Sequence, residues 1–133
     1  MLKINKKVEY ALMALKFLQN HPSALYSARE ISTRLTIPFD PTAKVLQILT
    51  NEGIVHAEQG VAGGYMLNVP LSSISLLNLM NSLENLSDDE NICETKNKTC
   101  ELIESCTIKG PISSLKKHII NFTNQLTLED ILK

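Results

Sequence analysis

Three glycines fall within six residues of this chain, at positions 60, 63 and 64, between two short segments with the composition of strands. Those segments are Ile54–Glu58 and Tyr65–Val69. Glycine adopts backbone conformations that other residues avoid, so the arrangement predicts an antiparallel hairpin with a flexible tip. A glycine loop that binds a dinucleotide is followed directly by a helix, whereas here a strand follows. The segment is therefore interpreted as a hairpin and not as a phosphate-binding loop.

Helical periodicity precedes the hairpin. From Lys6 to Leu18 apolar residues recur every three or four positions, which predicts a first helix with one apolar face. Ser27, followed three residues later by Glu30, is a capping-box signature and predicts a second helix that runs to Leu35. The side chains expected to be buried are Val8, Ala11, Leu12, Leu15 and Leu18 in the first helix and Ala28, Ile31 and Leu35 in the second.

A third helix is predicted after a turn at residues 36–39, and Gly53 ends it. Asp40 is expected to cap this helix, and Pro41 fits its first position because the missing N–H is not needed there. The side chains expected to face inward are Val45, Leu46 and Leu49, which leaves an outward polar face of Lys44, Gln47 and Asn51.

Three helices followed by a hairpin is the order of a winged helix-turn-helix, in which the third helix enters the DNA major groove and the hairpin reaches the adjacent backbone. A small three-helix bundle with an accessory hairpin has the same order of elements. We expect a mainly α fold with a small β-hairpin, namely a winged helix-turn-helix plus a long C-terminal dimerisation helix. Residues 1–70 would form the DNA-binding domain, and residues 71–133 a cysteine-containing loop and the dimerisation helices.

The carboxy-terminal part contains a heptad pattern. A fourth helix that includes Leu76–Leu83 is expected first, capped by Ser73 or Ser75, and Thr127 is expected to cap a last short helix. Between them, six apolar residues recur at alternating steps of four and three, which predicts a long helix with a seam for a homodimer partner. A core-facing helix within one chain is the alternative. The seam residues are Ile108, Ile112, Leu115, Ile119, Phe122 and Leu126.

All three cysteines of the chain, Cys93, Cys100 and Cys106, lie in a polar stretch before that long helix. Their spacings are wider than the about two to four residues of a zinc site, and three thiols cannot all pair within one chain. An iron–sulfur cluster accepts three thiolates and a fourth ligand of another residue type. Six acidic residues and only two lysines lie between residues 88 and 106, so free thiolates there would be costly without cationic iron. Three buried, inert thiols are the alternative.

The composition of the chain limits which partners it can bind and in which cellular compartment it is expected. Residues 1–60 carry seven Lys/Arg and five Asp/Glu, and the remainder six and nine, so the amino-terminal half is mildly basic, as suits nucleic-acid binding. We expect a cytoplasmic protein with no membrane partner, because no stretch is apolar enough to span a bilayer and no signal peptide is evident. An enzyme is not favoured, since His21, His56 and His118 are far apart and no nucleophile motif accompanies them.

Several of these pieces match a known pattern when they are taken together. They are the Glu9-Tyr10-Ala11-Leu12 start, the hairpin sequence GVAGGYML at 60–67, the helix from Ser75, the three loop cysteines and the closing Leu126-Thr127-Leu128. In this order and spacing they resemble the Rrf2 (Rrf-two) family of bacterial transcription regulators, over essentially the whole chain. The resemblance implies a dimeric winged-helix repressor or activator. Its DNA binding would be switched by an iron–sulfur cluster, 2Fe-2S or 4Fe-4S, held in the loop before the dimer helix.

The resemblance also implies a ligand set. Cys93, Cys100 and Cys106 match the cluster cysteines, although the first spacing is one residue longer than is usual in the family. Some members place a histidine three residues after the last cysteine, where this chain has Lys109. Members that respond to nitric oxide instead use a carboxylate from the first helix of the other subunit, and Glu9 occupies the matching position. An ordinary solvated glutamate is the alternative for Glu9.

The DNA-facing side is expected to combine base reading with phosphate contacts. Lysine can donate to guanine and glutamine can pair with adenine from the start of the third helix. Phosphate contacts supply much of the affinity, and Gln59 stands where the family usually has an arginine, so other cations are expected to contribute. The candidate DNA-binding residues are Arg29, Thr42, Lys44, Gln47, Gln59 and Gly60.

These observations predict a cytoplasmic, homodimeric transcription regulator that binds a double-stranded DNA operator. An iron–sulfur cluster would switch its binding in response to nitric oxide, redox state or iron–sulfur status. The alternative is a cluster-free winged-helix regulator that is switched by cysteine oxidation or by a partner protein.

Overall fold

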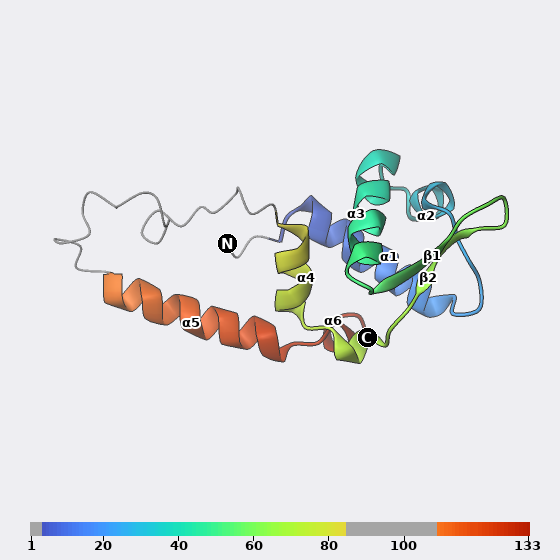
Figure 1. Cartoon of the computed structure of the whole chain (residues 1–133). Coiled ribbons are helices and arrows are strands. Elements are labelled where there is room, and N and C mark those ends of the chain that lie inside the picture. Colours follow the sequence, from blue (N-terminus) through green and yellow to red (C-terminus); the bar gives the residue numbers. More distant parts are fainter. Residues whose placement is uncertain (1–3, 85–108) are drawn as a thin grey trace.

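The computed structural model describes residues 4–84 and 109–133, which form a mainly helical fold with one two-stranded antiparallel sheet (Figure 1). The predicted fold class is confirmed, since this is a winged helix. We call α5 the arm and the other described elements the head. In chain order the elements are α1 (Lys6–Asn20), α2 (Ala28–Leu35), α3 (Phe39–Asn51), β1 (Val55–Glu58), β2 (Gly64–Leu67), a 3-10 turn η1 (Leu71–Ser73), α4 (Leu76–Leu83), α5 (Lys109–Gln125) and α6 (Leu128–Ile131).

Most helices of the head begin after a residue whose side chain caps the first turn. Asn5 accepts a hydrogen bond from the Val8 N–H at the start of α1. The predicted capping box of α2 is confirmed, because the Ser27 hydroxyl accepts from the Glu30 N–H and the Glu30 carboxylate accepts from the Ser27 N–H, both at 3.1 Å. Of the two serines proposed for α4, Ser75 is the cap.

The start of α3 differs from the prediction. The helix begins at Phe39 with Pro38 as its N-cap, so Asp40 and Pro41 lie within its first turn and Asp40 is not the cap. Pro41 is tolerated as the third helical residue because the N–H groups of a first turn have no intrahelical acceptor. Pro38 offers no side-chain cap, and its carbonyl accepts instead from the Thr42 hydroxyl at 2.7 Å.

The core of the head lies where α1 crosses behind α3 and meets α4. Leu15, Leu18 and Leu46 are fully buried there, together with Leu79 of α4. Burying one such side chain contributes about 1.5–3 kcal/mol relative to leaving it exposed. The amino-terminal helices and α4 therefore share one core.

The hairpin, which we call the wing, is tied to the segment between α1 and α2. Its strands pair from Val55 opposite Leu67 to Glu58 opposite Gly64. Tyr65 exchanges two backbone hydrogen bonds with Tyr26, of 2.8 and 3.1 Å. Gly64 has a φ of +152°, and a Cβ at this position would lie 2.7 Å from the Tyr26 carbonyl carbon. Only glycine lets the two backbones approach this closely.

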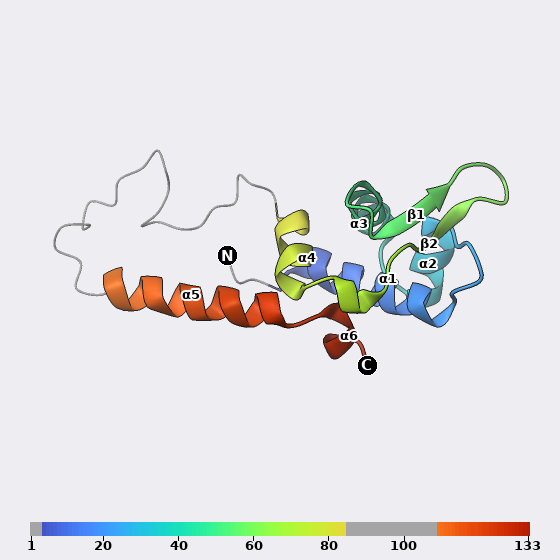
Figure 2. The ribbon, with the colours of Figure 1, turned by 60° about the horizontal axis from the view of Figure 1, so that its bottom comes forward.

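The chain end returns to the head and holds the base of the arm. Leu76 donates its N–H to the Leu126 carbonyl at 2.8 Å, and Leu128 donates to the Ile74 carbonyl at 2.9 Å. The side chain of Leu128 is fully buried, and Lys16 of α1 donates to the Leu132 carbonyl at 2.6 Å. From this anchor the arm extends away from α1–α3 in both ribbon views (Figures 1 and 2).

Thr127 caps α6 as predicted. Its hydroxyl accepts from the Asp130 N–H, and its own N–H donates to the Asp130 carboxylate. The backbone hydrogen bond from Thr127 lowers the pKa of Asp130. Within the described residues, no helix is both long enough and apolar enough to cross a membrane.

Candidate nucleic-acid interface

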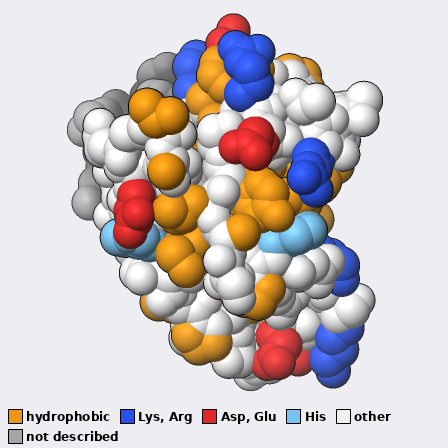
Figure 3. All heavy atoms as spheres, turned by 90° about the vertical axis from the view of Figure 1, so that its right-hand side faces the viewer, with side chains coloured by type: hydrophobic (Ala, Val, Ile, Leu, Met, Phe, Trp, Pro, Cys, Tyr) orange, Lys and Arg blue, Asp and Glu red, His pale blue; other side chains and the backbone are white. Residues whose placement is uncertain are grey.

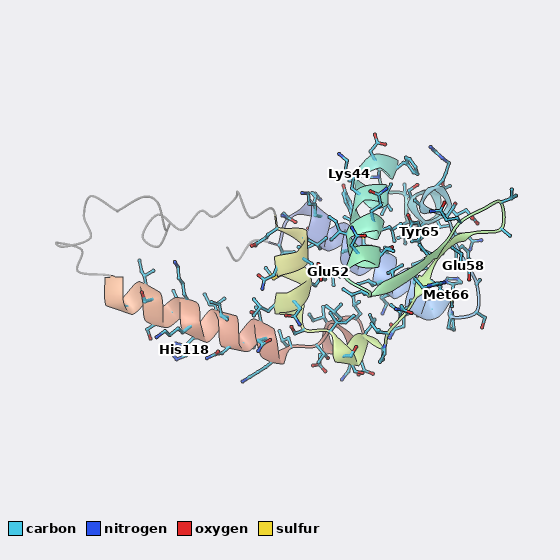
Figure 4. All side chains as sticks on the ribbon, in the orientation of Figure 1. Lys44, Glu52, Glu58, Tyr65, Met66 and His118 are labelled. Atoms are coloured by element: carbon cyan, nitrogen blue, oxygen red, sulfur yellow. The ribbon has the colours of Figure 1, made fainter. Side chains whose placement is uncertain are left out.

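The outward face of α3 is polar and open, as the helical period predicts. Lys44, Gln47 and Asn51 are all exposed. Lys44 projects from the first half of α3, and Glu52 lies at the other end of the helix (Figure 4). The three predicted side chains line a hollow of about 540 Å³ that also involves Lys7 of α1. Groups that donate hydrogen bonds therefore lie together on one open helix face.

Thr42 does not belong to this face, and its prediction as a base-reading residue is wrong. Its side chain is 0% exposed, and its hydroxyl donates to the Pro38 carbonyl. Thr42 is the fourth residue of α3 and lies three and four positions before Val45 and Leu46, so it shares their buried side of the helix. It fixes the first turn of the helix and cannot reach a DNA base.

A second hollow, of about 500 Å³, lies between the wing and the start of α2. It brings together three of the predicted DNA-contacting residues, Arg29, Gln59 and Gly60, which are all exposed. The guanidinium carbon of Arg29 lies 4.1 Å from the ring centroid of Phe39. This cation–π contact holds the arginine beside the first turn of α3.

Charges around these two hollows are mixed. Figure 3, viewed from the wing side, shows Lys and Arg side chains gathered at the top, the end at which Figure 1 places the start of α3. Glu30 and Glu58 also line the wing hollow. The Glu30 carboxylate is held by the capping box, and Glu58 lies 3.4 Å from the His56 Nε2. Near the start of α3, the exposed Arg29 and Lys44 thus face outward together with the exposed Asp40.

Two residues of the interface were missed by the sequence reasoning. Ile48 lines the α3 hollow and is half-buried, and Phe39 supports Arg29. Ile48 lies four positions after Lys44, so the helical period alone places it on the same face. Phe39 could not have been found in this way, because it precedes the predicted start of the helix.

The predicted cluster ligands Cys93, Cys100 and Cys106 lie outside the described residues. Glu9 is exposed on the first turn of α1, and its carboxylate lies 3.0 Å from the Lys6 ammonium. The hydrogen bond to Glu9, followed by its charge, raises the pKa of Lys6. Within residues 4–84 and 109–133, no three His, Cys, Asp or Glu side chains come together as a metal site. Glu9 therefore belongs to no such group among the described residues.

The predicted dimer seam lies largely on the open surface of the arm. Ile112, Leu115 and Phe122 are exposed, and Ile119 is half-buried. Leu126 packs partly against the core of the head, and Ile108 is outside the described residues. Ile120, which the heptad pattern did not include, is 39% exposed. A row of apolar side chains on a helix that projects from the head calls for a partner surface.

Two helices, an exposed third helix and a wing beside it define a winged helix-turn-helix protein of the DNA-binding class. The chain belongs to the Rrf2 family, whose model, described as "Iron-dependent Transcriptional regulator", matches residues 4–133. It is a transcription regulator of that family. The predicted family is therefore confirmed.

Individual proteins are similar to this chain at low sequence identity. Protein aau3 of Rhizobium meliloti (strain 1021) is 24% identical over 132 residues, which is 99% of this chain and 86% of that protein. The structure of T. potens IscR is similar with a TM-score of 0.70 and 22% identity, over 98% of this chain and 86% of that one. The structure of CymR, the global cysteine regulator of B. subtilis, is similar with a TM-score of 0.69 and 22% identity, over 99% and 97%.

Proposed function

We propose that this chain acts as a homodimer that binds a double-stranded DNA operator in the cytoplasm and is switched by an iron–sulfur cluster. The observation that carries the DNA-binding part is the open polar face of α3 beside the wing. Lys44 would donate to guanine and Gln47 would pair with adenine in the major groove. Arg29, Gln59 and Gly60 would contact the DNA backbone from the second hollow.

The exposed apolar row of the arm supports the proposed homodimer. Leu115 and Phe122 are largely exposed, although each would contribute about 1.5–3 kcal/mol if a partner covered it. A second copy of the arm offers the same apolar row, so that pairing of the two arms buries the apolar rows of both copies. Two α3 helices would then be held at a fixed distance, which matches the two half-sites of an operator.

The donor set fits an iron–sulfur cluster. Cys93, Cys100 and Cys106 would provide three thiolates, and Glu9 of the other subunit would provide an oxygen ligand in place of a fourth. Glu9 suits this role because its carboxylate is exposed and its neighbour Lys6 is a flexible, exposed lysine that can move aside. A bound cluster supplies iron chemistry that responds to nitric oxide, to oxidants and to iron supply.

The switch would act through α1. Glu9 lies on the same helix as Val8 and Ala11, which are buried against the core that α1 shares with α3. A ligand bond at Glu9 therefore restrains the helix that supports the reading face. Loss of that bond would free each head relative to the dimer axis and would change the half-site spacing that the dimer can match.

The test is anaerobic purification of the full chain, followed by visible absorption, iron and sulfide analysis, and operator binding. We expect a visible chromophore with iron and sulfide, lost in the Cys93→Ala, Cys100→Ala and Cys106→Ala variants. Glu9→Gln should keep the chromophore but shorten its lifetime in air or nitric oxide. Lys6→Gln is the matched control, since it removes the ion-pair partner and leaves the carboxylate. If Glu9→Gln and Lys6→Gln behave alike, Glu9 is not a ligand.

A second candidate function is a cluster-free regulator whose cysteines are oxidised or that binds a partner protein. Its support is the similar fold of Staphylococcus aureus CymR, of which one solved structure is titled the oxidized form. Protein free of iron and sulfide that nevertheless binds its operator, and releases it reversibly on thiol oxidation, would favour this alternative. Operator release that needs a second protein would favour the partner mechanism.

A further inference from the structure

The reading face of α3 is not uniformly polar. Ile48 and Pro41, both half-buried, line its hollow, and Val45 lies buried beneath them. The core-facing side of α3 is already filled by Leu46 and Leu49, which are fully buried. Ile48 packs partly against the core, and the rest of its apolar surface remains open on the face that carries Lys44 and Gln47.

The charge around this apolar floor suits a polyanion. Lys7 of α1 and Lys44 of α3 line the same hollow, against a single acidic side chain, Asp40. A DNA duplex that enters here would place a phosphate near the Lys7 ammonium group and a base edge near Lys44. The floor between them would then face the edges of the bases.

Only one base edge in the major groove carries an apolar group, the C5-methyl of thymine. We propose that the α3 hollow receives a thymine methyl, with Ile48 as the residue that specifies it and Pro41 as a second contact. Lys44 and Ile48 lie four residues apart and are therefore neighbours on the helix surface. A guanine bound by Lys44 places Ile48 over the adjacent base pair, so the operator should contain thymine next to that guanine. This inference rests on the proposed role of α3 as the reading helix.

The experiment begins with the full chain and a library of randomised DNA duplexes. Selected duplexes should share a thymine beside a guanine in each half-site. Each shared thymine is then replaced by deoxyuridine, which removes the methyl group and leaves every hydrogen-bonding group in place. At one of these positions the affinity should fall about four-fold, the effect of one buried methyl group.

Variants of the protein identify the residue that contacts this thymine methyl group. Ile48→Ala should bind the thymine and deoxyuridine duplexes equally, and Ile48→Val should keep most of the difference. Val61→Ala is the matched control, because Val61 is an exposed β-branched residue at the wing tip and outside the α3 hollow. It should keep the full four-fold difference. Thermal unfolding followed by circular dichroism confirms that each variant is folded.

The outcomes separate this inference from the proposed function. Lys44→Ala and Gln47→Ala variants that bind the selected duplex normally would remove α3 as the reader, and both proposals would fail. If those variants lose affinity but deoxyuridine has no effect at any position, the thymine contact alone is overturned. A deoxyuridine effect that persists unchanged in Ile48→Ala would likewise overturn the role of Ile48.

Discussion

The head and the arm place their apolar side chains in opposite ways. In the head, Leu15, Leu18 and Leu46 are fully buried. In the arm, Leu115 is 59% and Phe122 62% exposed, although the sequence of this helix is just as regularly patterned. The same residue types thus stabilise the head internally and leave the arm with unused apolar surface.

This difference separates what one chain can build from what needs a second copy. The reading face is supported by a complete core, so its geometry is present in the single chain. Among the described residues, the arm is held by its packing against α4, by the pairing of residues 74–76 with residues 126–128 and by the buried Leu128. We therefore expect arm substitutions to alter assembly and head substitutions to alter folding or DNA reading.

The largest effect is expected from a charge in the arm. Ile119→Glu would bury an unpaired carboxylate at the proposed partner contact, which costs several kcal/mol and should weaken dimerisation more than about 100-fold. Sedimentation equilibrium should report monomers with the circular dichroism spectrum of a folded head. Asn121→Glu is the control, because Asn121 is exposed on the same helix and outside the seam. A soluble Ile119→Glu dimer would place the interface elsewhere.

Gly64→Ala tests the head at the base of the wing. The new Cβ would meet the Tyr26 backbone at 2.7 Å and would stand on a backbone with a φ of +152°. We expect a loss of about 2–3 kcal/mol in unfolding free energy, together with weaker operator binding. Gly60→Ala is the matched control, since its φ is +105° but nothing lies within 4 Å of the new Cβ. Equal losses of unfolding free energy in the two variants would mean that the contact with Tyr26 does not contribute to stability.

Substitutions on the outward face of α3 should lower operator affinity without changing the stability of the fold. Lys44→Ala and Gln47→Ala should each weaken binding to the selected operator by about 1–3 kcal/mol, because each removes a contact with a base. Binding is measured at fixed salt, and unfolding is measured in parallel to show that the head is intact. Lys117→Ala on the arm should leave operator affinity within experimental error. If it weakens binding as much as Lys44→Ala, general charge and not base reading explains the loss.

The smallest effect concerns the end of α2. Thr36 is the one non-glycine residue of the described chain with positive φ, at 56°, and it is exposed. A β-branched residue in this conformation is strained, so Thr36→Gly should raise the unfolding free energy by about 1 kcal/mol. Chemical denaturation measures this change, and dimerisation through the arm should be unaffected. Thr33→Gly, inside α2, should destabilise the head instead, because glycine weakens a helix interior.

The sequence was sufficient wherever a short segment determines its own conformation. The helical period located α1, α2 and α4, the capping box at Ser27 located the start of α2, and the glycines located the wing. The polar face of α3 followed from the same period, because residues spaced by three and four share one side of a helix. These features depend on neighbours only a few residues away.

The tertiary structure decided where each local element meets a distant one. It alone set Ile48 as an apolar floor beside Lys7 and brought Gly64 against Tyr26. It also distinguished the filled core of the head from the open row on the arm, although both have the same apolar periodicity. Periodicity determines which side of a helix is apolar, and only packing between segments far apart in the chain determines what covers that side.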